Sequence, residues 1–300
     1  MLHFSCFHRS NVRQVALVKK VGILYHPRVE ATRTKAVELE RALKSRGVAA
    51  WVCSAWEKEE AGALLDGTDL LMTVGGDGTI LRAVQVVIPG RTPITGINLG
   101  KVGFMTEVDA AEVVARLPEL LDARGWIDER SMLQAELVAS GQSKQTFYAL
   151  NDVVVARGEI ARLIRVEASI DGRPLTTYKT DAVVVATATG STGYALAARG
   201  PVMHPQSPDF LLVPVAPHLS LPYPLVVPAA SEVRLVLRAY LAATLSVDGH
   251  INLPLADGDM VTIKRSPHFA RFRRIGPEGS FFSTLEDKLK GNQGGTGRKS

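Results

Sequence analysis

The stretch DLLMTVGGDGTILRAVQVVI, residues 69–88, decides the fold of the first half of the chain. Residues 69–74 are an apolar run of the length typical of a buried strand, and residues 80–88 are predicted to form a helix. Between them stand Gly75, Gly76, Asp77, Gly78 and Thr79. Glycines let the backbone approach a ligand closely, and N–H groups at the start of a helix bind phosphate. The stretch therefore predicts a strand, a phosphate-binding loop and a helix in direct succession.

Asp77 is the one residue of this loop that a phosphate cradle does not need. A carboxylate among phosphate-binding glycines repels the ligand, so its presence suggests a general base, an acceptor for a ribose hydroxyl or a partner for a metal ion. The alternative is a tight turn that contains an Asp-Gly step. The loop is not a P-loop, because no Gly-Lys-Ser/Thr follows, and it lacks the GxGxxG spacing of dinucleotide-binding loops.

Strands and helices alternate on both sides of this stretch. In the predicted helix 31–47, Ala36, Leu39 and Leu43 form one apolar stripe and Gly47 ends the helix. The expected strands are 21–27, 48–54, 69–74 and 92–100, and the expected helices are 31–47, 57–66, 80–88 and 110–125. This alternation predicts an α/β domain with a parallel sheet over residues 20–125.

The pattern changes near residue 126, where alternation with a period of two begins. In VEASID, residues 166–171, apolar and polar side chains alternate, and Asp171-Gly172 supplies a hairpin turn. A second Asp-Gly step at 248–249 divides another alternating run, 243–255. Residues 126–265 are therefore expected to form a mostly antiparallel β domain. The extensions 1–19 and 291–300 are expected to be flexible.

Composition and charge exclude several classes of protein. Apolar residues make up 46% of the 300 residues and charged residues 22%, as in globular proteins, and no apolar run is long enough to span a membrane. Cys6 and Cys53 have neither disulfide-framework nor zinc-ligand spacing, and the N-terminus lacks a continuous apolar signal segment, so we expect a cytoplasmic protein. The net charge is +5, and the basic cluster 265–275 fits either a solvated face or a site for polyanionic small molecules, without a nucleic-acid motif.

Three further segments carry polar residues at places where ligands bind. The loop 98–104 follows the strand next to the glycine-rich loop, where open parallel sheets bind ligands, and Phe104 fits either a stacked base or the core. The segment 180–194 ends an apolar strand in small hydroxylated residues and glycines, which suit phosphate and ribose or, alternatively, cap a helix that begins near Tyr194. Asn151-Asp152 opens a β run, where solvated side chains are the alternative.

Seven motifs, which follow one another along the chain, give it a resemblance to a known family. They are GGDGT, NLGKVGF, LNDVV, TDAVVVATATGSTGYALAARGP, PVAPHLSLPYPLVV, SVDGH and FFSTLEDKL, and they extend from residue 21 to about 290. This set resembles the NAD kinases, which phosphorylate NAD to NADP. The resemblance implies a Rossmann-like α/β domain, a β-sandwich-like domain that binds NAD, and a segment, 266–290, that returns to the first domain. It also implies a homodimer or homotetramer whose substrates are NAD and ATP, with Mg²⁺ or another divalent cation accompanying ATP.

The resemblance also implies roles for individual residues. Asp77 would accept the proton of the adenosine 2′-hydroxyl of NAD, which attacks the γ-phosphate of ATP. Gly75, Gly76, Gly78 and Thr79 would bind phosphates. The residues expected to bind NAD are Asp77, Gly78, Arg82, Phe104, Asn151, Asp152, Arg162, Lys179, Asp181, Thr189, Thr192, Gly193, Tyr194, Ala195, Leu196, Ala197 and His250. No residue is expected to hold a metal ion directly.

The chain departs from the family pattern at several positions. The family usually has Asn-Glu where this chain has Asn151-Asp152, and Arg199 introduces a bulky cation where a glycine is usual. These differences leave the preference for NAD or NADH open. The sequence also leaves open whether ATP or inorganic polyphosphate is the donor. Two alternatives are a lipid kinase of the diacylglycerol or sphingosine type, which shares the GGDGT loop, and a dinucleotide sensor without activity.

Overall fold

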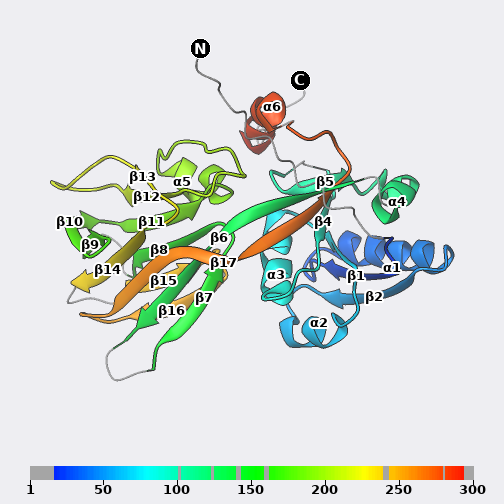
Figure 1. Cartoon of the computed structure of the whole chain (residues 1–300), viewed down its shortest axis with the longest axis horizontal. Helices are drawn as coiled ribbons and strands as arrows, with labels where there is room; N and C mark the ends of the chain where they lie inside the picture. Colours follow the sequence, from blue (N-terminus) through cyan, green and yellow to red (C-terminus); the bar gives the residue numbers. More distant parts are fainter. Residues whose placement is uncertain are drawn as a thin grey trace, which may run out of the picture.

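The computed structural model describes residues 17–100, 103–122, 125–139, 143–158, 162–238, 243–279 and 281–293. It has two halves, joined by two long strands that run from one half into the other (Figure 1). Among the described residues, no helix is long and apolar enough to cross a bilayer.

The first half is built on five parallel strands in the order β2-β1-β3-β4-β5. Their bounds are β1 Lys20–Tyr25, β2 Ala49–Ser54, β3 Leu70–Val74, β4 Ile94–Asn98 and β5 Thr106–Asp109. The helices between them are α1 Glu30–Lys44, α2 Lys58–Leu64, α3 Asp77–Val87 and α4 Val113–Leu121. The parallel α/β fold predicted from the sequence is confirmed, although β5 was not expected.

The helices cover both faces of this sheet. Ala36, Leu39 and Leu43 on α1 are fully buried, and they pack with α4 against one face. Helices α2 and α3 pack on the other face, where Ile80 and Val84 are buried. The stripe of apolar residues on α1 therefore predicted its packing correctly.

Helix α3 begins at Asp77, three residues earlier than expected. The N–H of Thr79 bonds to the carbonyl of Gly76 at 2.9 Å, so the second part of the GGDGT loop is already the first helical turn. A carboxylate in the first turn of a helix is favoured by the helix dipole. The loop and the helix start are thus one unit.

The second half is a sandwich of two antiparallel layers. One layer has the order β13-β12-β11-β8-β15-β16. Its strands are β8 Asp152–Arg157, β11 Ala182–Thr187, β12 Phe210–Val215, β13 Leu225–Val227, β15 Ala243–Val247 and β16 Ile251–Leu255. The facing layer contains β6 Trp126–Val138, β7 Gln145–Ala149, β9 Ile164–Ile170, β10 Arg173–Thr180, β14 Glu232–Arg238 and β17 Met260–Arg274. Apolar side chains from both layers form one core, as the alternating sequence pattern predicted.

The two Asp-Gly steps lie in hairpins. Asp171 and Gly172 have φ angles of 50° and 75° and join β9 to β10 in two residues. Asp248 and Gly249, with φ angles of 49° and 69°, lie between β15 and β16. Positive φ angles at both central residues are the geometry that Asp-Gly favours in hairpins.

Strand β17 makes the two halves parts of one sheet. It pairs with β6 along most of its length and runs parallel to β4 at the Phe272–Ile94 pair. The basic cluster 265–275 lies largely in this strand, where Arg273 and Arg274 are buried. A solvated face is therefore the wrong interpretation for these two arginines.

The last element of the described residues is α6, Phe281–Gln293, which lies above the junction of the two halves (Figure 1). The rings of Phe281 and Phe282 meet His204 of the second half at 5.5 and 5.6 Å. Residues 291–293, the first of the expected C-terminal extension, belong to this helix. Residues 1–16 and 294–300 of the expected extensions lie outside the described residues.

Candidate functional site

Asp77 is held in place by the loop that follows β4. Its Oδ2 accepts the backbone N–H of Phe104 at 3.0 Å, and its Oδ1 accepts that of Met105 at 3.2 Å. The contact is close because Gly103 has no side chain: a Cβ atom there would lie 2.3 Å from Oδ1 of Asp77. The two neighbouring strand ends, β3 and β4, thus fix the direction of this carboxylate.

The glycines of the loop differ in what they can offer a ligand. Gly76 and Gly78 are exposed, whereas the N–H of Gly75 bonds to the carbonyl of Ile97 within the sheet. Thr79 is buried, and its hydroxyl has no hydrogen-bond partner among the described residues. Gly76 and Gly78 therefore present the backbone that a phosphate can reach.

Asn151 and Asp152 are positioned by a carboxylate from a distant hairpin. Oδ1 of Asp248 accepts the N–H groups of Asn151 and Asp152 at 2.7 and 3.2 Å, and its Oδ2 accepts that of Leu150 at 2.9 Å. The N–H of Asp248 in turn donates to the carbonyl of Asp152 at 3.0 Å. This buried carboxylate fixes the start of β8.

Both carboxyl groups have raised pKa values. Burial raises the pKa of Asp152 to about 6. Burial also raises the pKa of Asp248 to about 7, although its three backbone hydrogen bonds oppose the shift, and the charge of Asp152 adds to it. Two carboxyls in a site with such pKa values are typical of functional positions.

The loop 187–194 packs directly on Asn151. The hydroxyl of Thr187 donates to the carbonyl oxygen of Leu150 at 2.6 Å, and the backbone N–H of Thr187 donates to the carbonyl oxygen of Asn151 at 2.9 Å. A Cβ atom at Gly190 would lie 2.0 Å from the carbonyl oxygen of Asn151, so only glycine fits there. Residues 190–192 form one turn of 3-10 helix, and Tyr194–Ala197 form the short helix α5.

Tyr194, Asp181 and Asp152 share one region of the second half. Burial raises the pKa of Tyr194, and the charges of Asp181 and Asp152 raise it further. Asp181 is paired with Arg157 at 3.1 Å. The expected NAD-binding residues Asn151, Asp152, Asp181, Thr189, Thr192, Gly193 and Tyr194 thus belong to neighbouring segments. The short helix also carries Ala195, Leu196 and Ala197, of which Ala195 is buried and Ala197 exposed.

Four further residues expected to bind NAD are Arg82, Arg162, Lys179 and His250. Arg162 and Lys179 are exposed. Arg82 lies on α3 with its guanidinium 4.0 Å from the ring centre of Trp56. His250 follows the hairpin of Asp248 and contacts the Asp248 carbonyl through Nδ1 at 3.0 Å.

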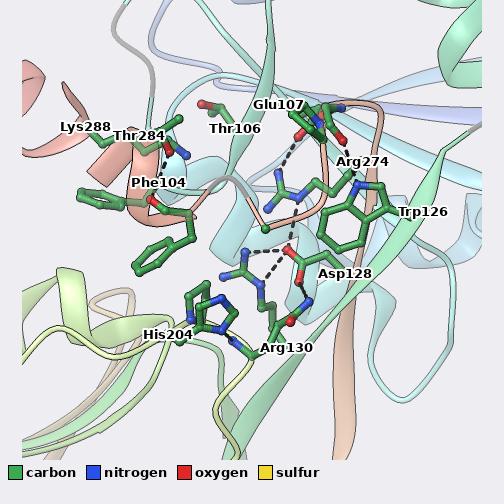
Figure 2. Close-up of a pocket in the computed structure, with 16 residues that line it drawn as sticks. Phe104, Thr106, Glu107, Trp126, Asp128, Arg130, His204, Arg274, Thr284 and Lys288 are labelled. Carbon is green, nitrogen blue, oxygen red and sulfur yellow. Dashed lines mark hydrogen bonds and ion pairs between the residues drawn. The ribbon is translucent and has the colours of Figure 1, made fainter. Parts of the chain in front are cut away.

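A pocket of about 90 Å³ lies at the junction of the halves, below α6 (Figure 2). Phe104 lines it, as do side chains from β6, β17 and α6. At its base, Asp128 pairs with Arg130 at 2.6 Å and with Arg274 at 3.3 Å, and all three side chains are buried (Figure 2). Burial alone would raise the pKa of Asp128, but the hydrogen bond and charge of Arg130 outweigh it and lower the pKa.

This charge network connects the two sides of the site. Nη1 of Arg274 donates to the carbonyl of Met105 at 2.8 Å, and the N–H of Met105 holds Asp77. At the other end, Nη1 of Arg130 donates to the hydroxyl of Thr189 at 3.3 Å. Lys288 of α6 lines the same pocket; burial lowers its pKa, as does Arg274, while Asp77 opposes the shift.

Sequence reasoning missed Asp128, Arg130, Asp248, Arg274 and Lys288. Asp248 was assigned only to a turn. Asp128 and Arg130 gave a signal, because they share the strand face of Met132, which is buried. A charged pair at core positions of a strand indicates a network that has to be satisfied internally.

The chain is similar in sequence to NAD kinases along most of its length. The chain matches the model of the ATP-NAD kinase N-terminal domain over residues 5–124 and that of the C-terminal domain over residues 150–275. It is 46% identical to an NAD kinase of Dehalococcoides mccartyi over 278 residues, which cover 92% of this chain and 98% of the relative. It is 38% identical to an NAD kinase of Chloroflexus aurantiacus over 274 residues, 91% of this chain and 99% of the relative.

Two solved structures are similar in fold. Yeast NADH kinase, complexed with NADH, has a TM-score of 0.81 and 26% identity, with 95% of this chain and 91% of that chain covered. An NAD kinase from Archaeoglobus fulgidus, in complex with ATP, has a TM-score of 0.73 and 27% identity, with 91% and 99% covered. The two halves, the glycine-rich loop and these similarities together identify the chain as a member of the ATP-NAD kinase family.

Proposed function

We propose that the protein transfers the γ-phosphate of ATP to the adenosine 2′-hydroxyl of NAD, or of NADH, and so produces NADP or NADPH. One observation carries this proposal: the carboxylate of Asp77 is fixed by two backbone N–H groups beside the exposed glycines Gly76 and Gly78. An acid group next to a phosphate-binding helix start is the arrangement that transfer to a hydroxyl requires.

Asp77 acts as the general base in this proposal. Its carboxylate takes the proton of the 2′-hydroxyl while the hydroxyl oxygen forms a bond to the γ-phosphorus. The bond from that phosphorus to the bridging oxygen breaks, and ADP leaves with the electron pair. Phosphoryl transfer depends mainly on positioning and on stabilisation of charge, so the fixed direction of Asp77 supports this role.

The dinucleotide is held by the second half and by Phe104. We assign the ribose hydroxyls and base edges to Asn151 and Asp152, the nicotinamide end to Asp181, and the remaining contacts to the loop 189–197. The side-chain amide oxygen of Asn151, Oδ1, supports the assignment, because it is buried without a hydrogen-bond partner among the described residues. A buried acceptor of this kind is stabilised by a donor from a ligand.

Mg²⁺ is expected to arrive with ATP. Among the described residues, no three His, Cys, Asp or Glu side chains are grouped so that they could hold a metal ion. Mg²⁺ commonly binds substrate phosphates and water with only one or two protein carboxylates, and Asp77 is the nearest carboxylate to the exposed glycines in sequence. When bound, the ion neutralises phosphate charge.

The remaining expectations extend the same proposal. We propose a cytoplasmic enzyme that works as a homodimer or homotetramer. The lipid-kinase alternative is not retained, because both matching family models are those of ATP-NAD kinases. The inactive-sensor alternative is opposed by the intact GGDGT loop with its oriented carboxylate.

The variant Asp77→Asn tests the role of the base. We expect the rate of NADP formation to fall by at least about 100-fold, because the carboxamide cannot accept the proton. The measurement is a coupled NADP-formation assay, with NAD binding followed by calorimetry. Asp66→Asn, at an exposed position just after the end of α2, is the matched control. A folded Asp77→Asn protein that forms NADP at the wild-type rate would disprove the assignment.

A further inference from the structure

Arg274 is a buried arginine at the end of β17, and it lies between Glu107 and Asp128 (Figure 2). Its Nε is 3.3 Å from Oδ2 of Asp128. The same oxygen already accepts Nε and Nη2 of Arg130 at 2.8 and 2.6 Å, so the charge of Asp128 is balanced without Arg274. Removing a second arginine from water costs free energy that its other contacts have to offset. Those contacts therefore indicate what Arg274 does.

The guanidinium of Arg274 holds the chain where β5 begins. Nη1 donates to the carbonyl oxygen of Met105 at 2.8 Å and to Oε2 of Glu107 at 3.1 Å. Oε1 of Glu107 in turn accepts the backbone N–H groups of Ile275 and Gly276, both at 2.8 Å. The end of β17 and the start of β5 are thus joined by side chains from each segment to the backbone of the other.

Met105 connects this contact to the carboxylate of Asp77. Its carbonyl accepts Arg274, whereas its N–H donates to Oδ1 of Asp77 at 3.2 Å. The N–H of Phe104 donates to Oδ2 of Asp77 at 3.0 Å. The side chain of Met105 is buried, so both sides of this residue are fixed. A movement of its backbone that Arg274 prevents would change the direction of the carboxylate.

The other bonds of this segment do not replace the one from Arg274. The N–H of Gly103 donates to the hydroxyl of Thr106 at 2.9 Å, a bond within the turn that shapes it but does not attach it to the second half. Among the described residues, Arg274 is the one charged side chain that donates a hydrogen bond to the backbone of residues 103–107. The planar guanidinium also keeps its donors in fixed directions.

We propose that Arg274 is a positioning residue, which sets the direction of the Asp77 carboxylate through the backbone of Met105. The inference rests on the proposed kinase function, in which Asp77 is the general base, and it adds the contact that orients this base. Glu107 and Asp128 hold the guanidinium in place. Because β17 runs from the second half into the sheet of the first, the orientation of the base depends on how the two halves are joined.

The first test compares turnover with substrate binding. In Arg274→Gln we expect kcat for NADP formation to fall at least about tenfold, because a small displacement of a catalytic group strongly lowers the rate of the chemical step. The KM values for NAD and ATP should change less than about threefold, since proton transfer to the base occurs only in the transition state. Circular dichroism establishes that the variant is folded.

Arg274→Lys extends the test to a variant that keeps the positive charge. The ammonium group can still balance Glu107 and Asp128, so this variant is informative even if Arg274→Gln does not fold. A single ammonium cannot reproduce the three donor directions of the guanidinium, so kcat should fall at least about threefold, again with nearly unchanged KM values.

The Asp77→Asn background distinguishes positioning of the base from a general structural defect. If Arg274 acts through the carboxylate, the double variant Asp77→Asn with Arg274→Lys should form NADP within about twofold of the rate of Asp77→Asn alone. A structural defect would instead lower the rate by the same factor in both backgrounds.

Arg271→Gln is the matched control on the same strand. Nη2 of Arg271 pairs with Glu129 at 2.9 Å, and among the described residues its side chain has no bond to residues 103–107. Its kcat should stay within about twofold of the wild-type value, because a partly exposed ion pair contributes little.

The outcomes separate this proposal from the proposed function. A wild-type protein that forms no NADP would remove the kinase assignment. An active wild type would overturn the role of Arg274 if folded Arg274→Lys has the wild-type kcat, or if its loss of kcat is equally large in the Asp77→Asn background.

Discussion

Asp248 is a carboxyl group on which burial and hydrogen bonding act in opposite directions. Burial favours the protonated form and raises the pKa to about 7, while three backbone N–H groups favour the charged form. Because those N–H groups belong to residues 150–152, Asp248 also holds Asn151 and Asp152 in place.

The raised pKa of Asp248 predicts how stability depends on pH. The ordinary pKa is 3.8, so between about pH 4 and pH 7 the folded protein binds more protons at this site than the unfolded chain. The contribution to the free energy of unfolding therefore decreases as pH rises through this window, by up to about 1.4 kcal/mol per pH unit. In Asp248→Asn this decrease should be absent, so urea unfolding at pH 5 and pH 8 should give a smaller difference than in the wild type.

The chain contains a matched control for this variant. Asp171 has the same position in an Asp-Gly hairpin, and its Oδ1 accepts the N–H of Glu232 at 2.9 Å, but it is exposed. Asp171→Asn should leave the pH dependence as it is in the wild type. An equal change in both variants would show that turn geometry, and not burial of the charge, causes the effect.

At the scale of elements, β6 and β17 do more than join the two halves. Strand β6 contributes Asp128 and Arg130, and β17 contributes Arg274, so that their pairing forms the buried charge network below α6. The network also reaches Met105, next to Asp77, and Thr189 in the second half. The two strands therefore align the loops of both halves.

Removal of Asp128 should destabilise this junction. In Asp128→Asn, Arg130 and Arg274 lose their shared buried counter-charge, and we expect the free energy of unfolding at neutral pH to fall by about 3–5 kcal/mol. Because the pKa of Asp128 is lowered in the folded protein, its contribution is present above the ordinary pKa of 3.8 and is lost as pH falls below it. Urea unfolding at several pH values measures both effects.

A surface ion pair provides the control. Glu38 pairs with Lys35 at 2.6 Å on the outside of α1, with half of its side chain exposed, and Glu38→Gln should change stability by no more than about 0.5 kcal/mol. Equal losses of stability in the two variants would contradict a special role for the network.

At the scale of the whole molecule, the site is made where the two halves meet, and the edge of the sandwich exposes apolar side chains. Residues 219–226, which lead into and include the start of β13, expose Leu219, Tyr223 and Val226 to 94%, 68% and 56%. Apolar side chains grouped on a surface commonly mark contacts between proteins.

The proposed homo-oligomer predicts that this surface lies in the contact. Light scattering should give the wild-type protein a multiple of the 32.3 kDa chain mass, and Tyr223→Asp with Val226→Asp should shift it toward the monomer because the charges cannot be buried. Val138→Asp, at another exposed apolar position, should not shift it. A monomeric wild type would remove the basis for the prediction.

Much of the fold could be predicted from sequence because its signals are local. The stripe on α1, the apolar run of β3 and the Asp-Gly turns each depend on residues close together in the chain, and each is found in the structure. The sequence does not predict that β6 pairs with β17, because the paired residues are far apart in the chain. Val138 at the end of β6 pairs with Met260 at the start of β17, and 121 residues lie between them. Polar residues also interrupt the apolar pattern of both strands.

By itself, the sequence determined the parallel α/β half, the antiparallel half, the glycine-rich loop with its carboxylate and the resemblance to the NAD kinases, because these follow from periodicity and from contiguous motifs. Only the tertiary structure decided what surrounds that carboxylate. The hydrogen bonds from Phe104 and Met105 to Asp77 and those from residues 150–152 to Asp248 join residues far apart in the chain. The energy of such contacts depends on distance in space and on burial, and neither quantity is fixed before the chain has folded.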